Sequence, residues 1–352
     1  MKILILALSG IGDALMFTPA LKLLRQTYPD VQIDALVMFK AVKDMYERNS
    51  DINKIHYFEF LNSGFLPSLK FLFGLRKKYD VSINVYPSNR KEYNVINFLL
   101  GAPKRAGVNY LRMNFQEFGF LNNISIIEDD SLHNVQTNIK LVEKLLHKKF
   151  DEEPDLNFSL NKGDETFAEE FIANTKINPN DLVIGFHPGS ATLKNHIKRR
   201  WEPEKYIQLG KKLIDVKNAK ILIFGGPEEE ELKNFILSGI NSKNVNSVVT
   251  KNLPQSAAIL KRCDVFVTND SSMLHIASAM KRKVVALIGP TNKNYIHPWK
   301  TDYKIVSLNL ECAPCFIYSP RPLTCSRNDV KFKCIKEMSV DLVYSAVLDF
   351  LQ

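Results

Sequence analysis

Short, nearly continuous apolar runs alternate along this chain with longer amphipathic segments. In the first half the apolar runs predict strands at 2–8, 31–37, 54–58, 81–86 and 104–108. Amphipathic spacing predicts helices at 14–27, 40–49, 65–78, 91–100 and 133–150. Strands that are apolar throughout and separated by helices are typical of parallel sheets covered on both faces.

The alternation is interrupted once, by the polar stretch DEEPDLNFSLNKGDE at 151–165, for which we predict a linker. It then restarts, with predicted strands in LVIGFHPG, AKILIFGG, NVNSVVT, DVFVTND, KVVALIGP and YKIVSL. We therefore predict an α/β protein with two Rossmann-like domains whose parallel sheets face each other across a cleft. The first domain is expected over 1–160 and the second over 170–337.

Composition adds a preference for anionic partners. The 352 residues carry a formal charge of +9, which favours phosphates, acidic glycolipids, membrane surfaces or nucleic acid. We expect no nucleic acid as a partner, because the chain has no recognised binding motif or basic–aromatic surface pattern.

The apolar windows of the sequence are shorter than the roughly 20 residues that span a bilayer. Glycines soon interrupt the first run, MKILILAL, so it is interpreted as a buried strand rather than a signal peptide. We expect a cytoplasmic protein.

Four of the five cysteines are clustered near the C-terminus. They follow the pattern C-x2-C-x9-C-x8-C, formed by Cys312, Cys315, Cys325 and Cys334. Four thiolates can close a tetrahedral zinc shell, so a structural zinc site is one hypothesis. Reduced thiols are the alternative in a cytosolic protein.

The stretch ALSGIGDAL links the first predicted strand to the first helix. Gly10 and Gly12 fit a phosphate-binding turn, but Leu15 stands where a dinucleotide fingerprint has its third glycine. Asp13 at the tip of the turn would repel a phosphate. The pattern therefore disfavours a nicotinamide-dependent oxidoreductase and assigns this turn to a part of the site that does not hold phosphates.

In a parallel sheet, ligands bind at the carboxyl ends of the strands, and polar residues follow several strands of the second half there. They include His187, Ser190, Glu229, Asp270, Ser271, Ser272 and His275. A helix starting near Ser272 would offer free N–H groups to a phosphate. Asp270 would discourage that phosphate unless its carboxylate turns toward backbone donors or a hydroxyl. Arg199 and Arg200 can supply bidentate donors to a pyrophosphate.

Three motifs in this order resemble the heptosyltransferase-type glycosyltransferases of family 9. They are GDALMFTPALKLLRQTYP, then HPGS with KRRWEPEKY and LIFGGPEEEE, then CDVFVTNDSSMLHIASAMKRKVVALIGPT. The resemblance implies a GT-B fold, with the acceptor bound mainly by the first domain and a nucleotide-sugar by the second. The C-terminal helix (about 338–352) often packs back onto the first domain in such folds. The implied reaction moves a heptose from an ADP-heptose-type donor to the lipopolysaccharide inner core, with inversion, no metal and no other cofactor.

The resemblance also implies roles for individual residues. Asp13 matches the general base, Arg199 a donor-phosphate contact with Arg200 beside it, and Glu229 an acid that holds the ribose. The donor pyrophosphate and sugar segment matches Asp270, Ser271, Ser272 and His275, and His187 and Ser190 are placed on the donor side too. On the acceptor side we place Gly10, Gly12, Arg90, Lys91 and Arg105. An anionic glycolipid acceptor implies peripheral contact with the cytoplasmic face of the inner membrane.

Some residues depart from the family pattern, and other functions stay open. Ser272 stands where the family commonly has glycine, and Arg199 where it commonly has lysine. The chain could use another nucleotide-sugar and another cell-surface glycan, or bind a sugar nucleotide without catalysis. A packed core histidine explains His275 equally well, and ordinary solvated surface explains the basic residues on the acceptor side.

Overall fold

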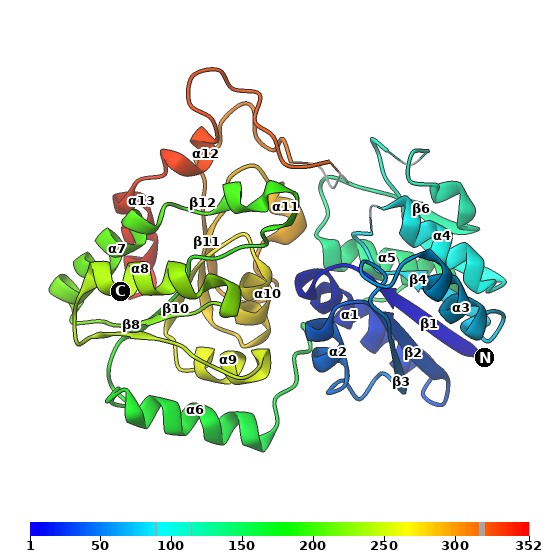
Figure 1. Ribbon diagram of the computed structural model, residues 1–352, viewed down its shortest axis with the longest axis horizontal. Helices are drawn as coiled ribbons and strands as arrows, with labels where there is room; N and C mark the ends of the chain where they lie inside the picture. Colours follow the sequence, from blue (N-terminus) through cyan, green and yellow to red (C-terminus); the bar gives the residue numbers. More distant parts are fainter. Residues whose placement is uncertain (89, 114, 317–320, 352) are drawn as a thin grey trace. The chain divides into compact units, whose positions relative to one another are not determined.

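The structure, a computed structural model, describes residues 1–88, 90–113, 115–316 and 321–351 (Figure 1). Two compact units divide between Ser159 and Leu160, inside the segment predicted as a linker. Each unit is built on a six-stranded parallel sheet with helices packed on both faces. The predicted α/β class with two parallel sheets is confirmed.

The first unit has the strand order β3-β2-β1-β4-β5-β6. Its strands are β1 (Lys2–Ala7), β2 (Gln32–Val37), β3 (Lys54–Tyr57), β4 (Val81–Asn84), β5 (Lys104–Asn109) and β6 (Ile124–Ile127). Its helices are α1 (Ile11–Thr27), α2 (Lys40–Tyr46), α3 (Phe65–Leu75), α4 (Lys91–Leu100), the short 3-10 helix η1 (Gly119–Leu121) and α5 (Asn134–Leu146). The direction of strand succession reverses between β1 and β4, so these two strands mark the switch point where ligands bind in such sheets.

Period-two alternation in β1 explains how the first sheet is covered. Leu4 and Leu6 pack with Leu72 of α3 and Leu100 of α4 in one cluster. The odd positions are buried on the opposite face, where α1 packs against α5. Because β1 is buried on both faces, its buried residues are all apolar. The polar residues that could bind a ligand therefore follow Ala7, in the turn after the strand.

The second unit repeats this topology, with the order β12-β11-β10-β7-β8-β9. Its strands are β7 (Val183–His187), β8 (Lys220–Ile223), β9 (Val245–Ser247), β10 (Val265–Asn269), β11 (Lys283–Leu287) and β12 (Tyr303–Val306). Its helices are α6 (Lys162–Asn174), α7 (Pro203–Lys217), α8 (Glu230–Ile240), α9 (Leu253–Leu260), α10 (Ser272–Ala279), α11 (Lys293–Ile296), α12 (Lys333–Lys336) and α13 (Val340–Leu348), with 3-10 turns η2 (Leu193–Arg199) and η3 (Pro227–Glu229). Here β7 and β10 form the switch point.

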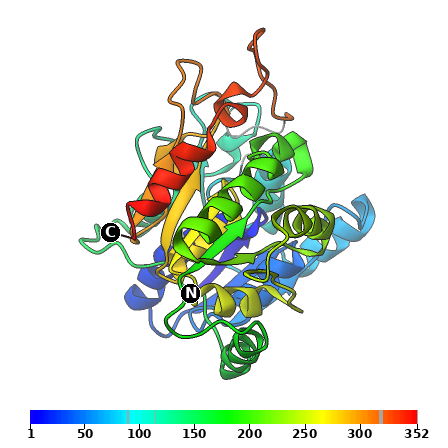
Figure 2. The ribbon, with the colours of Figure 1, turned by 90° about the vertical axis from the view of Figure 1, so that its left-hand side faces the viewer.

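The C-terminal helix α13 belongs to the second unit, beside α7 (Figures 1 and 2). Val343 and Val347 are fully buried in the same core cluster as Leu213 of α7 and Val285 of β11. The sequence led us to expect that this helix could pack on the first domain. In the structure its apolar face completes the core of the second unit, since α7, β11 and β12 offer an apolar surface directly alongside.

Close packing between neighbouring strands gives a test of the second core. A Cβ on Gly185 of β7 would lie 2.5 Å from the Phe266 ring and 2.9 Å from the Cys263 sulfur, whereas one on Gly74 of α3 would meet nothing within 4 Å. Gly185→Ala should therefore lower the free energy of unfolding by about 1–3 kcal/mol, since both neighbours are buried and cannot move away. Gly74→Ala should raise it by about 0.5–1 kcal/mol through helix propensity. Urea denaturation followed by circular dichroism measures both, and equal effects at the two glycines would contradict the packing described.

Candidate functional site

In the first unit, Asp13 lies in the first turn of α1, directly after the carboxyl end of β1. Gly10 is the residue before the helix, with an extended backbone (φ −70°, ψ 175°), and a Cβ there would meet nothing within 4 Å. The turn itself therefore does not require glycine at this position; open space remains beside it. The Ser9 hydroxyl donates to the Pro87 carbonyl at 2.7 Å and ties this turn to the end of β4, across the switch point.

The acceptor-side residues fall at two different ends of the first sheet. Arg90 directly precedes α4 and Lys91 begins it, after the carboxyl end of β4 and thus on the same edge as Asp13. Burial raises the pKa of Tyr93 to about 12; the charge of Arg90 opposes this shift and the charge of Asp13 adds to it. Both charges therefore act on the Tyr93 hydroxyl.

Arg105, in contrast, is the second residue of β5 and lies at the amino ends of the strands. Its guanidinium donates to the carbonyls of Leu121 and Ala102 at 3.0 and 2.9 Å. The structure therefore does not bring Arg105 together with Asp13. These hydrogen bonds give Arg105 a structural role. Its position near the start of a predicted strand could have indicated this role, whereas its positive charge suggested an acceptor contact.

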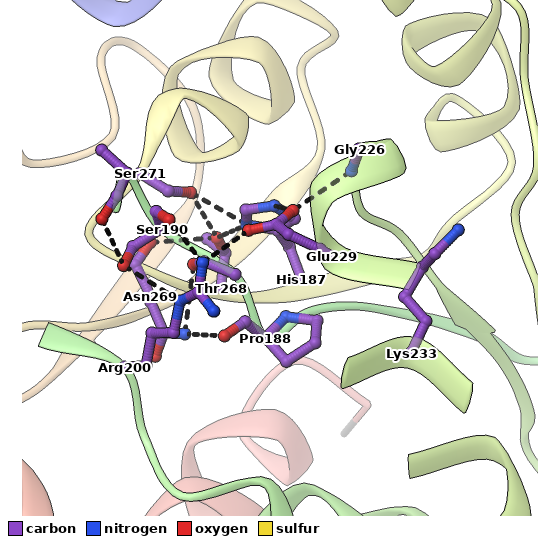
Figure 3. A network of polar contacts seen from close by, with 12 residues as sticks. His187, Pro188, Ser190, Arg200, Gly226, Glu229, Lys233, Thr268, Asn269 and Ser271 are labelled. Atoms are coloured by element: carbon purple, nitrogen blue, oxygen red, sulfur yellow. Dashed lines mark hydrogen bonds and ion pairs between the residues drawn. The ribbon is translucent and has the colours of Figure 1, made fainter. Parts of the chain in front are cut away.

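In the second unit, His187 links the ends of three strands (Figure 3). Its Nε2 lies 3.3 Å from Glu229 Oε2, and its Nδ1 lies 3.0 Å from the Ser271 hydroxyl. With Nε2–H donating to the carboxylate, Nδ1 accepts from Ser271. His187 ends β7, Glu229 follows β8, and Ser271 follows β10, so one buried imidazole joins all three predicted positions.

Glu229 is buried, with 5% of its surface exposed, yet it is held as an anion. Its Oε2 also accepts the Gly226 N–H at 3.1 Å, and its Oε1 accepts from Arg200 at 3.1 Å. Burial alone would raise the pKa of Glu229, but His187, the Gly226 amide and Arg200 outweigh it, and the pKa lies below its ordinary value of 4.5. A Cβ on Gly189 would lie 1.7 Å from Oε1, so the carboxylate needs glycine there.

Arg199 and Arg200 are adjacent in sequence but bind different carboxylates. Arg200 donates to Glu229 and, at 2.6 Å, to the Ser190 carbonyl. Arg199 donates to Asp270 Oδ2 at 2.5 Å, and the Thr291 hydroxyl donates to the same oxygen at 2.6 Å. The Asp270 carboxylate is thus turned toward a hydroxyl, as the sequence reasoning required if an anion is to bind beside it.

His196, which the sequence reasoning did not select, completes the surroundings of Arg199. Its Nδ1 lies 3.0 Å from an Arg199 nitrogen, and its ring meets Phe316 edge-on at 5.1 Å between centroids. Burial lowers the pKa of His196 to about 4, helped by the nearby Arg199 charge, so the ring is neutral at pH 7. The Arg199 guanidinium lies 5.4 Å from the Phe316 ring centre, which adds a cation–π contact.

Asn269, at the last position of β10, aligns the backbone of this cluster. Its side chain accepts the Trp201 N–H at 3.0 Å and donates to the Pro188 carbonyl at 2.7 Å. The same fully buried amide thus fixes the segment after Arg200 and the turn after His187. The strand-end rule that selected Asp270 could have selected Asn269 as well.

The N-terminus of α10 has an unusual cap. Ser271 occupies the N-cap position, but its hydroxyl bonds His187 and Thr268 and makes no cap bond to the helix amides. Ser272 is the first residue of α10, and His275 lies one turn later, buried, with an Nδ1 that has no partner among the described residues. Burial lowers the pKa of His275 to about 4.

The four clustered cysteines lie between β12 and α13, close enough to influence one another. Burial raises the pKa of Cys334 to about 11, and the other three thiols of the cluster add to the shift. The Phe332 N–H points at the Cys325 sulfur at 3.3 Å, and Arg327 lies 3.7 Å from the Cys312 sulfur. Across the described part of the chain, however, no three or more His, Cys, Asp or Glu side chains are arranged to hold a metal ion. The geometry therefore gives the zinc hypothesis no ligand set.

Comparison with known proteins identifies the family. The family model "Glycosyltransferase family 9 (heptosyltransferase)" matches residues 69–322, which is more than half of the chain. The chain belongs to glycosyltransferase family 9. It is therefore a glycosyltransferase, and the resemblance stated from its motifs is confirmed.

Curated relatives in this family match over most of their length. The lipopolysaccharide heptosyltransferase 2 of Escherichia coli strain K12 is 25% identical over 88% of this chain and 88% of its own. The lipooligosaccharide heptosyltransferase 2 of Haemophilus influenzae is 27% identical over 88% of this chain and 89% of its own.

Solved structures of the family share the fold. The E. coli ADP-heptose lipopolysaccharide heptosyltransferase II has a TM-score of 0.74 at 21% identity, covering 100% of this chain and 98% of its own. A family 9 glycosyltransferase from Veillonella parvula has a TM-score of 0.76 at 21% identity, covering 99% of this chain and 97% of its own. The predicted GT-B fold class is thereby confirmed.

The charge on Glu229 makes a pH-dependent contribution to stability. Because the pKa of Glu229 is lowered in the folded state, its contribution is complete above its ordinary value of 4.5 and is lost as the pH falls through the folded value. At pH 7, Glu229→Gln should lower the free energy of unfolding by about 2 kcal/mol, since Arg200 loses its buried partner. The difference from the wild type should shrink as the pH falls below about 4.5.

Urea titrations at several pH values measure this difference. The exposed neighbour Glu228 provides the control, and Glu228→Gln should change the free energy of unfolding by less than about 0.5 kcal/mol. A Glu229→Gln deficit that is the same at pH 7 and at pH 3 would show that the carboxylate charge is not what stabilises this cluster.

Proposed function

We propose that this glycosyltransferase moves a heptose from an ADP-heptose-type donor to a lipopolysaccharide inner-core acceptor, with inversion and without a metal ion. The observation that carries the proposal is the family match over residues 69–322, together with relatives named as heptosyltransferases over 88% of the chain. Family members that use another nucleotide-sugar and another surface glycan form the alternative.

Donor binding is assigned to the second unit. The Ser271 hydroxyl at the N-cap of α10 bonds His187 and does not cap the backbone N–H groups of the first helical turn. These N–H groups can therefore donate to a diphosphate placed at the N-terminus of the helix. Asp270 does not oppose this anion strongly, because Arg199 and Thr291 hold its carboxylate. Arg199, Arg200 and the helix amides then stabilise the charge that develops on the departing ADP.

Glu229 is proposed to hold the ribose of the donor. A carboxylate offers about four lone-pair sites. His187 and Gly226 donate to Oε2, and Arg200 donates to Oε1, which leaves Oε1 able to accept one ribose hydroxyl. The buried ion pair fixes the direction of that lone pair, so the nucleoside is positioned before the sugar reacts.

Acceptor activation is assigned to Asp13 in the first unit. In the proposed displacement the acceptor oxygen forms a bond to the anomeric carbon while the bond to the diphosphate oxygen breaks, and its electron pair leaves with ADP. The hydroxyl proton passes to the Asp13 carboxylate. The family model begins at residue 69, so this role rests on the motif GDALMFTPALKLLRQTYP and on the position of Asp13 at the switch point of the first sheet.

Replacing Asp13 by asparagine should separate binding from turnover. Asp13→Asn keeps the size of the side chain and cannot accept the proton, so kcat should fall by about 10²–10⁴-fold while the donor Kd changes less than about threefold. Asp30→Asn, an exposed acid that follows α1, is the matched control and should keep the wild-type rate. Steady-state kinetics measures kcat, and calorimetric titration of the donor in the absence of acceptor measures its Kd. A near-normal kcat in Asp13→Asn would remove the base assignment.

The donor itself can be identified with a panel of ADP-, UDP-, GDP- and CMP-sugars, offered with delipidated core acceptors and analysed by mass spectrometry. We expect transfer from ADP-heptose, with a mass increase of one heptose on the acceptor. Transfer from a non-ADP donor alone would replace the proposed donor and support the alternative within the family.

A further inference from the structure

Helix α3 of the first unit exposes large apolar side chains that the fold does not bury. Phe65 and Leu66 each have 75% of their surface exposed, and Phe73 has 55%. Leu66, Lys70 and Phe73 follow one another at spacings of four and three residues, so they share one face of the helix. Single exposed apolar residues are ordinary, but three on one short helix form an apolar patch of the kind that marks an interaction site.

The helix is fixed with this face outward. Phe71, on its inner side, stacks on Phe58 at 4.4 Å between ring centroids and meets Phe60 edge-on at 6.0 Å. Leu72 and Leu75 are buried in the core cluster shared with β1 and α4. Because these contacts hold the inner face, rotation that would bury Phe73 would expose Leu72 and Phe71 instead.

The charge around this face has one sign. Between residues 60 and 79 the chain carries four basic residues and no acidic one: Lys70, Arg76, Lys77 and Lys78. All four are exposed. The acids that flank this segment are engaged elsewhere, since Asp80 accepts from the Lys2 backbone N–H at 2.6 Å and Glu59 accepts from the Tyr57 hydroxyl.

We propose that α3 is a docking surface for an anionic phospholipid bilayer, on which the helix lies in the plane of the interface. Aromatic and aliphatic side chains of this kind enter the boundary between headgroups and acyl chains, while lysine and arginine side chains reach the anionic headgroups. Charge complementarity selects the bilayer as the occupant, because a second copy of the chain would bring the same positive charges against these. Across the described residues no helix has the length and apolar composition to cross a membrane.

The position of α3 in the sheet connects this surface to catalysis. Phe65 follows β3 and therefore lies toward the carboxyl ends of the strands, the edge on which Asp13 lies, while Arg76 precedes β4 and lies toward the amino ends. This inference deepens the proposed function, since a glycolipid acceptor is itself held in a bilayer. The docking surface does not include any residue of the proposed donor or acceptor sites.

Vesicle co-sedimentation of the full chain tests the proposal without donor or acceptor. The wild type should bind phosphatidylglycerol–phosphatidylethanolamine vesicles more tightly than phosphatidylcholine vesicles, and added salt should weaken the binding. Phe65→Ser with Phe73→Ser should weaken binding to the anionic vesicles at least about tenfold, and Lys70→Gln about fivefold. The matched controls on the second unit, Phe235→Ser (Phe235 is 50% exposed) and Lys211→Gln, should bind as the wild type does.

The remaining measurements separate this proposal from its rivals. Circular dichroism and turnover on a delipidated acceptor should be unchanged in every variant, so a loss of activity in Asp13→Asn and a loss of vesicle binding in the α3 variants are independent results. The proposal is overturned if the wild type does not bind anionic vesicles, if it binds phosphatidylcholine equally well, or if the double variant binds as the wild type does. Sedimentation velocity that shows a dimer, dissociated by the same double variant without vesicle binding, would assign the surface to a second copy instead.

Discussion

The second unit depends on compensating two carboxylates that are buried at the ends of its strands. Glu229 and Asp270 are each about 95% removed from solvent, and a lone buried carboxylate would be strongly destabilising. Arg200 and Arg199 supply the two opposite charges, and an imidazole, an amide and a hydroxyl donate further hydrogen bonds to the two carboxylates. Because these partners come from the segments after β7, β8 and β11, satisfying the two charges fixes the relative positions of the loops that form the candidate site.

Two consecutive arginines can serve two separate carboxylates because the backbone changes conformation between them. Arg199 ends the 3-10 turn η2, and Arg200 is extended (φ −75°, ψ 131°), so their side chains diverge. Asn269 then holds the Trp201 N–H, and the Trp201 ring donates its N–H to the Met338 carbonyl at 2.9 Å. The core of the unit thereby anchors the charged loop, which keeps the guanidinium groups in place without relying on their own ion pairs.

The sequence predicts the framework well and the pairing of side chains poorly. Apolar runs located β1 and the strands around His187 and Asp270, because parallel strands buried on both faces leave a strong periodic signal. The strand β6 was missed because Ile124–Ile127 is only partly buried, and the helical pattern of α13 does not indicate which apolar surface its buried face covers. Which arginine meets which carboxylate depends on loop geometry, and so does the placement of Arg105 at the opposite edge from Asp13. Neither leaves a periodic pattern.

Each unit places a carboxylate near the switch point of its sheet, and the proposed reaction gives the two carboxylates different roles. Asp270 Oδ2 already accepts from Arg199 and Thr291, so we assign this carboxylate to holding the loops of the donor side rather than to proton transfer. Asp13 lies in the first turn of α1, where the N–H groups of a helix start interact favourably with an anion, and a carboxylate is in any case a weak base. In the proposed reaction this is no obstacle, because the acceptor hydroxyl becomes acidic only as its oxygen bonds to the anomeric carbon. A carboxylate that stays ionised until that moment accepts the proton when it is released, and it does not hold one beforehand.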